Sequence, residues 1–215
     1  MKLKLVTFVI IIISSNILPQ QSKLSKAVNY LSDFIASDNF LQLKTTNSDL
    51  ALVDSIYLRA VAFTENDYSE ALLALTFTTI PYNEVPIILP LIKSIVYFPL
   101  ISADDSTYNL KNKNLPTRLF FDTPNTVYGD RDKLAHFFGN AFIGYSENIF
   151  DLSNLIGYFV ESFEESFKVQ SKVDYRDLDV NRYGDLFGKL LQEDKKILPS
   201  QVMLIRSLSY IIIIL

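Results

Sequence analysis

The chain has 215 residues, a formal net charge of -4 at pH 7 and a pI near 5.0. This length suits one main domain, and the lack of a basic field excludes non-specific nucleic-acid binding. Hydrophobic residues make up 49% of the chain and the mean hydropathy is +0.19, but repeated long apolar runs are missing. We therefore expect the protein to lie close to a membrane without crossing it. The sequence contains no cysteine, which excludes disulfides, thiolate metal sites and a lipid-modified N-terminal cysteine.

Residues 1–21 have the order of a secretory signal peptide. A basic start, Met1-Lys2-Leu3-Lys4, is followed by an apolar run over residues 5–13 and then by small polar residues. The run is too short to cross a bilayer as a helix, which needs about 20 apolar residues. We expect cleavage between about Ser15 and Ser22 and export, to the periplasm or the outer membrane. The alternative is a buried N-terminal strand or helix.

Residues 22–80 are predicted to form a helical region. Apolar residues recur at helical spacing over residues 23–36. Ser48 or Asp49 can begin a second helix through Ala62, and Thr64 with Asp67 resembles a capping pair for a third helix through about Phe77. No internal repeat is present, so packing helices are favoured over a helical-repeat interaction module.

Residues 81–127 are predicted to be a proline-rich extended segment followed by a polar loop. The prolines at 81, 86, 90 and 99 forbid a regular helix, while the residues between them are rich in β-branched and aromatic types. A minor extended or β segment is therefore expected around residues 84–100. The polar residues 102–118 are expected to form a solvated loop or a lid.

Residues 128–198 are predicted to be the helical core, and they contain three polar signatures. At about 100° per residue, Asp132, His136 and Asn140 share one side of a helix over about residues 132–145. His136 is the only histidine in the chain. Because a lone histidine cannot complete a usual zinc set, a hydrogen-bonded core histidine is the competing interpretation.

Two further helices carry the other signatures. In a helix over about residues 152–167, Glu161 and Glu164 share a side with Gly157, and an ordinary solvated face is the alternative. A glycine there allows another backbone to approach the carboxylates. A helix over about residues 177–192 presents a polar face with two glycines, which predicts a close helix crossing. That face contains Asp177, Asn181, Gly184, Asp185 and Gly188.

These signatures resemble those of the VanZ-like families. The resemblance rests on Asp-Lys-x-x-His-Phe at residues 132–137, the pair Glu161 and Glu164, and Asp-x-x-x-Asn-x-x-Gly-x-x-x-Gly at residues 177–188, about a quarter of the chain. Glu164 stands where a glutamine is often found in those families. The resemblance implies a kinship with small exported lipoprotein-type members, whose biochemical activity is not established. Polar residues interrupt the apolar runs here, which favours a soluble or peripheral version over a transmembrane one.

Three functions follow as hypotheses. The first is an exported, membrane-peripheral cell-envelope protein that binds an envelope component through a polar site. The second is a metal-dependent hydrolase that uses the same cluster with a divalent cation. The third is a purely structural helical module. No other cofactor is indicated, and neither a catalytic residue nor a metal ligand can be assigned individually. The candidate ligand-binding residues are Asp132, His136, Asn140, Glu161, Glu164, Asp177, Asn181 and Asp185, with Gly157, Gly184 and Gly188 as structural glycines.

The apolar C-terminal tail, residues 199–215, ends in an isoleucine run over residues 211–214. The tail is too short to span a bilayer as a helix. Isoleucine has a high β propensity, and an exposed run would be prone to aggregation. We expect this tail to be covered by the fold or lodged at a membrane surface.

Overall fold

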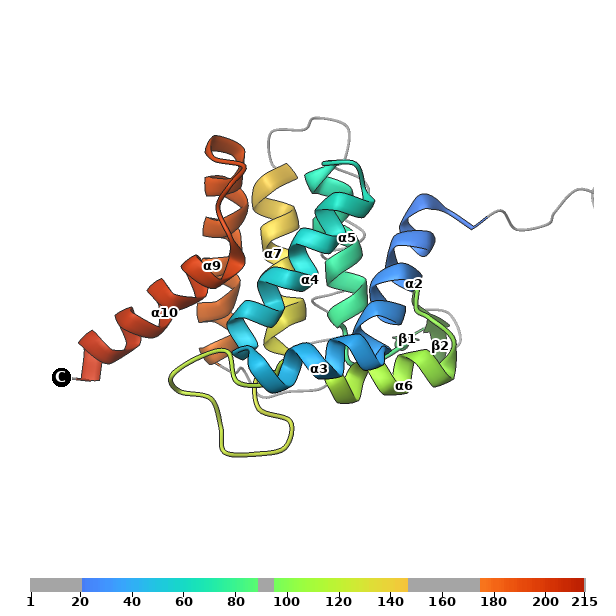
Figure 1. The fold of residues 1–215 in the computed structure, drawn as a ribbon, viewed down its shortest axis with the longest axis horizontal. Helices are drawn as coiled ribbons and strands as arrows, with labels where there is room; N and C mark the ends of the chain where they lie inside the picture. Colours follow the sequence, from blue (N-terminus) through green and yellow to red (C-terminus); the bar gives the residue numbers. More distant parts are fainter. Residues whose placement is uncertain (1–20, 89–94, 147–174, 215) are drawn as a thin grey trace, which may run out of the picture.

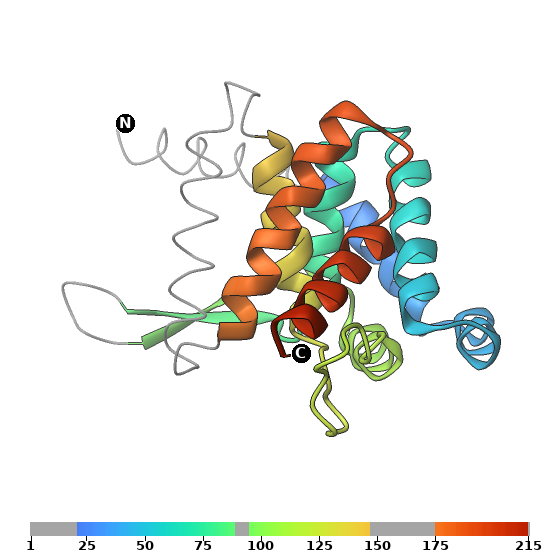
Figure 2. The same cartoon turned by 90° about the vertical axis from the view of Figure 1, so that its left-hand side faces the viewer.

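The protein is mainly helical, as the sequence predicts, with a small two-stranded antiparallel sheet. A computed structural model describes residues 21–88, 95–146 and 175–214 (Figures 1 and 2). Within these ranges the helices are α2 (Lys23–Ala36), α3 (Asp38–Thr46), α4 (Asp49–Phe63), α5 (Tyr68–Thr79), α6 (Asp105–Asn114), α7 (Lys133–Ser146), α9 (Tyr175–Glu193) and α10 (Pro199–Ile214). The strands are β1 (Glu84–Ile88) and β2 (Ile95–Pro99).

Capping residues divide the N-terminal region into four helices rather than the three predicted. Ser37 ends α2 and begins α3, because its backbone N–H donates to the carbonyl of Phe34 while its hydroxyl accepts from the N–H of Phe40. The helix α5 begins after Asp67, whose carboxylate accepts from the N–H of Glu70. Thr64 instead ends α4, so the predicted capping pair was wrong in its roles.

The predicted extended segment is a hairpin of β1 and β2, with Glu84 opposite Pro99 and Ile88 opposite Ile95. All five residues of β2 are exposed. The hairpin projects from the helical body (Figure 2). Pro86 and Pro99 lack the N–H that would let a further strand pair at their positions, which blunts the edges of this sheet.

The polar stretch after the hairpin is not a loop or a lid, because most of it forms α6. Asp104 caps this helix by accepting from the N–H groups of Ser106 and Thr107. Two polar side chains then attach α6 to the body. Lys111 donates to the carbonyl of Ile80, and Asn114 donates to the carbonyl of Ile35. The polar composition of this stretch therefore predicted solvent exposure, whereas Lys111 and Asn114 are buried and hold α6 to the body.

The helices α7 and α9 lie side by side and run parallel at the centre of the molecule (Figures 1 and 2). The predicted close crossing is present. A methyl group at Gly184 would collide with the carbonyl oxygen of Phe137, and one at Gly188 with that of Ala141. These collisions show that the two backbones are in contact, which only glycine allows. The other side of α7 packs on α5.

The C-terminal tail is a helix, despite the β propensity of its isoleucines. The helix α10 packs on α4 and α9 through buried residues that include Val202, Met203 and Arg206. Leu204 and Leu208 lie on its exposed side. No helix in the described ranges is both long enough and apolar enough to cross a membrane.

Candidate functional site

The parallel pairing of α7 and α9 brings two of the three polar signatures together. His136 and Asn140 lie one turn apart on α7, and Asp177 and Asn181 lie one turn apart on α9. The Nε2 atom of His136 lies 3.5 Å from Oδ1 of Asp177. Parallel helices place like positions side by side, so each turn of α7 faces the matching turn of α9.

A chain of hydrogen bonds defines which nitrogen of His136 carries the proton. The side-chain amide of Asn140 donates to the backbone carbonyl of His136 at 2.9 Å, and a carbonyl can only accept. The same amide nitrogen lies 2.8 Å from Oδ1 of Asn181, which therefore accepts. That oxygen lies 3.0 Å from Nδ1 of His136. Nδ1 must then donate, and in the neutral imidazole Nε2 carries the lone pair.

Burial favours the neutral form of this histidine. His136 is 5% exposed, and burial lowers its pKa below the ordinary value, although the carboxylate of Asp177 acts in the opposite direction. A neutral imidazole with a fixed tautomer is the form in which histidine binds a metal ion.

Lys133 places a positive charge between two carboxylates at the same point. Its ammonium lies 2.7 Å from Oδ2 of Asp132 and 2.5 Å from Oδ1 of Asp177. The side chain of Lys133 is 3% exposed, whereas that of Asp132 is 44% exposed. The site is therefore enclosed on the lysine side and reaches solvent through Asp132.

Asp132, His136 and Asp177 form a possible metal-binding triad. Their ligand atoms all lie within 4.8 Å of one another. Tetrahedral bonds of about 2.0–2.1 Å separate two ligand atoms by about 3.3 Å. The separation of 3.5 Å between Nε2 of His136 and Oδ1 of Asp177 is close to that value.

The other predicted site residues have different placements. Asp185 does not join the cluster, because its carboxylate pairs with Lys189 one turn later on α9 at 2.8 Å. This is an ordinary pair on an exposed helix face. Glu161, Glu164 and Gly157 lie outside the described residues, as does the predicted helix that contains them.

Sequence reasoning missed a second ionic cluster, which begins one residue before Asp177. Arg176 donates to Asp122 and to Asp130, and Arg206 of α10 pairs with Asp122 and Asp179. Asp130 is fully buried, and it also accepts from the N–H groups at 119 and 120. Nothing in the sequence pairs these residues, because they come from three separate segments. The cluster holds the N-terminus of α9 in the position that the triad requires.

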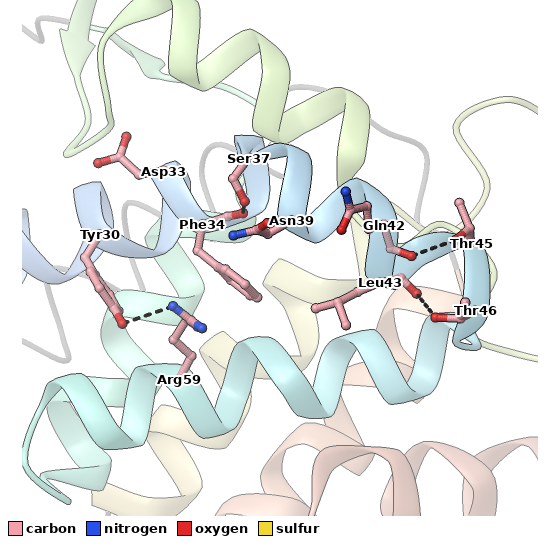
Figure 3. Close-up of a pocket in the computed structure, with 10 residues that line it drawn as sticks. All are labelled: Tyr30, Asp33, Phe34, Ser37, Asn39, Gln42, Leu43, Thr45, Thr46 and Arg59. Carbon is pink, nitrogen blue, oxygen red and sulfur yellow. Dashed lines mark hydrogen bonds between the residues drawn. The ribbon is translucent and has the colours of Figure 1, made fainter.

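A large cavity lies elsewhere in the fold. It has a volume of about 740 Å³ and opens between α2, α3 and α4 (Figure 3). Its wall includes Arg59, whose guanidinium lies 3.9 Å from the ring centre of Phe34 and donates to the hydroxyl of Tyr30. None of the predicted site residues lines this cavity. The candidate site is therefore identified by its chemistry and not by a pocket.

Comparison of the chain with family models, with curated proteins and with solved structures found no match.

Proposed function

We propose that the protein binds a divalent cation through Asp132, His136 and Asp177. The observation that carries this proposal is the hydrogen-bond chain through Asn140 and Asn181, which fixes the tautomer of His136. Two atoms with lone pairs, Nε2 of His136 and Oδ1 of Asp177, lie 3.5 Å apart and favour a shared cation between them. Zn²⁺ and Mn²⁺ are the ions best suited to one imidazole and two carboxylates.

The ligand set also supports hydrolytic chemistry as an extension of this proposal. Three protein ligands with the remaining position open to water are typical of catalytic zinc sites, whereas structural sites use four. The exposed side of Asp132 is where a water molecule or a substrate would reach the ion. A divalent ion held by Asp132, His136 and Asp177 would activate water for hydrolysis by lowering its pKa.

Metal analysis of the purified protein, with and without chelator, tests the cation site, followed by titration of the chelated protein with Zn²⁺ and Mn²⁺. We expect binding of one ion and its loss in His136→Gln and Asp177→Asn. Asp185→Asn is the matched control, because it removes a carboxylate from the same helix outside the triad. Equal affinity in Asp177→Asn and in the parent protein would overturn the proposal.

A structural role is the second candidate, and the position of Lys133 favours it. Its ammonium already pairs with both carboxylates of the triad, so lysine itself can be the cation that joins α7 to α9. The variant Lys133→Gln separates the two functions. For a metal site the change removes a competing charge, and metal affinity rises. If Lys133 instead joins α7 to α9, Lys133→Gln lowers the free energy of unfolding, and neither the parent protein nor the variant binds metal.

We also propose that the protein is exported and peripheral to a membrane, as a cell-envelope protein of VanZ-like type. The order of residues in positions 1–21 and the three polar signatures support this proposal. The exposed apolar side chains of β2, among them Tyr97 and Phe98, are suited to a membrane interface. Cell fractionation with N-terminal sequencing tests it. Recovery of Met1 from a cytosolic fraction would contradict export.

A further inference from the structure

The cavity between α2, α3 and α4 results from the way these helices are joined (Figure 3). Ser37 ends α2 and begins α3, so no loop separates the two helices. The helix α3 buries Phe40, while most of its other side chains are exposed. Figure 3 shows α3 along one side of the cavity and α4 along the other. The volume of about 740 Å³ lies within the usual range of small-molecule sites, about 300–1,000 Å³.

The guanidinium of Arg59 is held in this cavity by two aromatic side chains. It lies 3.9 Å from the ring centre of Phe34, and its Nη1 donates to the hydroxyl of Tyr30 at 3.2 Å. Both rings are themselves fixed. Phe34 packs edge-on against the buried ring of Phe40 at 5.2 Å, and Tyr30 stacks on Phe63 at 4.3 Å between ring centres. An arginine held in this way is pre-organised, so it loses little side-chain entropy when it binds a ligand.

Most of the hydrogen-bond donors of Arg59 remain free after its bond to Tyr30. Stacking on Phe34 occupies the face of the guanidinium, whereas its N–H groups lie in the plane and point outward from the edges. No carboxylate of the described residues lies within 4.0 Å of this guanidinium. Asp33 also lines the cavity, but Figure 3 shows its carboxylate directed away from Arg59. The arginine can therefore donate to an anion in the cavity.

The hydroxyl of Tyr30 adds a further donor at the same place. A guanidinium can only donate, so the hydroxyl oxygen of Tyr30 accepts from Arg59 and keeps its own hydrogen for another acceptor. Within the described part of the chain, no group accepts that hydrogen. An anion beside Arg59 can thus accept from the guanidinium and from the hydroxyl together.

The side of the cavity formed by α3 carries no charge. Asn39 and Gln42 lie three residues apart on α3, and both line the cavity. Their side-chain amides make no hydrogen bond with the described residues, so each can donate and accept. Leu43 lines the same side, is 37% exposed, and provides apolar surface. The cavity therefore surrounds one space with a cation, neutral polar groups and apolar side chains.

We propose that this cavity binds a small organic carboxylate, with Arg59 as its anchor. The two oxygens of a carboxylate match the planar fork of a guanidinium. The charged residues that line the cavity are Arg59 and Asp33. A monoanion is balanced by this one cation, whereas a dianionic phosphate would need a second cation and would be repelled by Asp33. Phe34 and Leu43 are suited to contact the carbon skeleton of the ligand. The site is independent of the proposed metal triad, none of whose residues lines the cavity.

Titration of the full chain with benzoate and with hexanoate tests the site at pH 7, where carboxylates are ionised. Ligand-observed NMR measures the affinity, and benzamide and hexanamide are the neutral comparisons of the same shape. We expect saturable binding of at least one carboxylate with a dissociation constant on the order of 1 mM, since these probes have few atoms. The matching amide should bind about tenfold more weakly or worse, because the charge-assisted hydrogen bonds are lost. Failure of both carboxylates to bind, or equal affinity for acid and amide, would overturn the proposal.

Three variants locate the binding. Arg59→Gln should weaken binding of the carboxylate by about tenfold or more. The matched control is Arg118→Gln, which removes an exposed arginine outside the cavity and should change the affinity less than twofold. Tyr30→Phe keeps the ring that stacks on Phe63 and removes the hydroxyl, so it should weaken binding by about three- to tenfold with the fold unchanged. Equal affinity in Arg59→Gln and the parent protein, or equal weakening in both arginine variants, would place the carboxylate elsewhere and contradict the assignment.

Discussion

At the scale of single residues, the informative feature is the hydrogen-bond chain around His136. One backbone carbonyl fixes the orientation of Asn140, which fixes that of Asn181, which in turn fixes the proton on Nδ1. The sequence placed Asn140 and Asn181 among the candidate residues from helical periodicity. Helical periodicity does not predict which of these groups donates and which accepts, because that depends on how α7 packs against α9.

The tautomer of His136 is a direct prediction of this chain of bonds. In the metal-free protein at neutral pH, we expect ¹⁵N NMR to show a protonated Nδ1 and an unprotonated Nε2. The chain has a single histidine, so the signals need no assignment. Asn181→Ala removes the acceptor and should give a mixture of tautomers. It should also weaken metal binding by about 10–100-fold, the usual effect of losing a partner that orients a metal ligand. A protonated Nε2 in the parent protein would contradict the orientation of Asn140.

At the scale of secondary-structure elements, sequence reasoning succeeded where hydrophobic periodicity or proline punctuation was strong. The helices α2, α4, α7 and α9 and the hairpin follow the predicted ranges within a few residues. It failed for α3 and α6, whose polar sequences bury few side chains and show little periodicity. No secondary structure was predicted from the sequence for α10, where the packing of Val202, Met203 and Arg206 on the body overrides the β propensity of isoleucine.

The glycines of α9 support a prediction at this scale. A methyl group at Gly188 meets the backbone of α7 at the carbonyl of Ala141 and the N–H of Tyr145. Backbone cannot move aside as a side chain can, so Gly188→Ala should destabilise the protein by about 1–3 kcal/mol or more. Arg182→Ala, at an exposed position of the same helix, is the control and should have little effect. Urea unfolding measures both changes, and equal stability of the two variants would show that the crossing is not close.

At the scale of the whole molecule, a buried ionic cluster connects three parts of the chain. Asp122 belongs to the segment between α6 and α7, Arg176 to the start of α9, and Arg206 to α10. Both arginines donate to Asp122. No local pattern predicts such a cluster, because its members are separated by up to 84 residues. The candidate site depends on it, since Arg176 directly precedes Asp177.

The acid sensitivity of the fold follows from the same cluster. Burial raises the pKa of Asp122, but the hydrogen bonds and charges of Arg206 and Arg176 outweigh this effect and hold the pKa well below its usual range. A carboxylate whose folded pKa lies below its unfolded value, about 3.9, stabilises the fold above that pH. Its contribution decreases as the pH falls below about 4. Acid should therefore weaken the attachment of α10 and of the start of α9 to the body.

Asp122→Asn tests this assignment. At pH 7 the variant leaves two guanidinium groups without their shared carboxylate, and removing one partner of a buried ion pair costs about 3–5 kcal/mol. At pH 3 the difference in unfolding free energy between variant and parent should be smaller, because below about pH 4 the unfolded parent takes up a proton at Asp122 and the stabilisation from the ionised form decreases. Asp38→Asn, at an exposed position on α3, is the control and should show little difference at either pH. If the loss of unfolding free energy in Asp122→Asn stays constant from pH 7 to pH 3, the side chain of Asp122 acts through its shape and not through its charge.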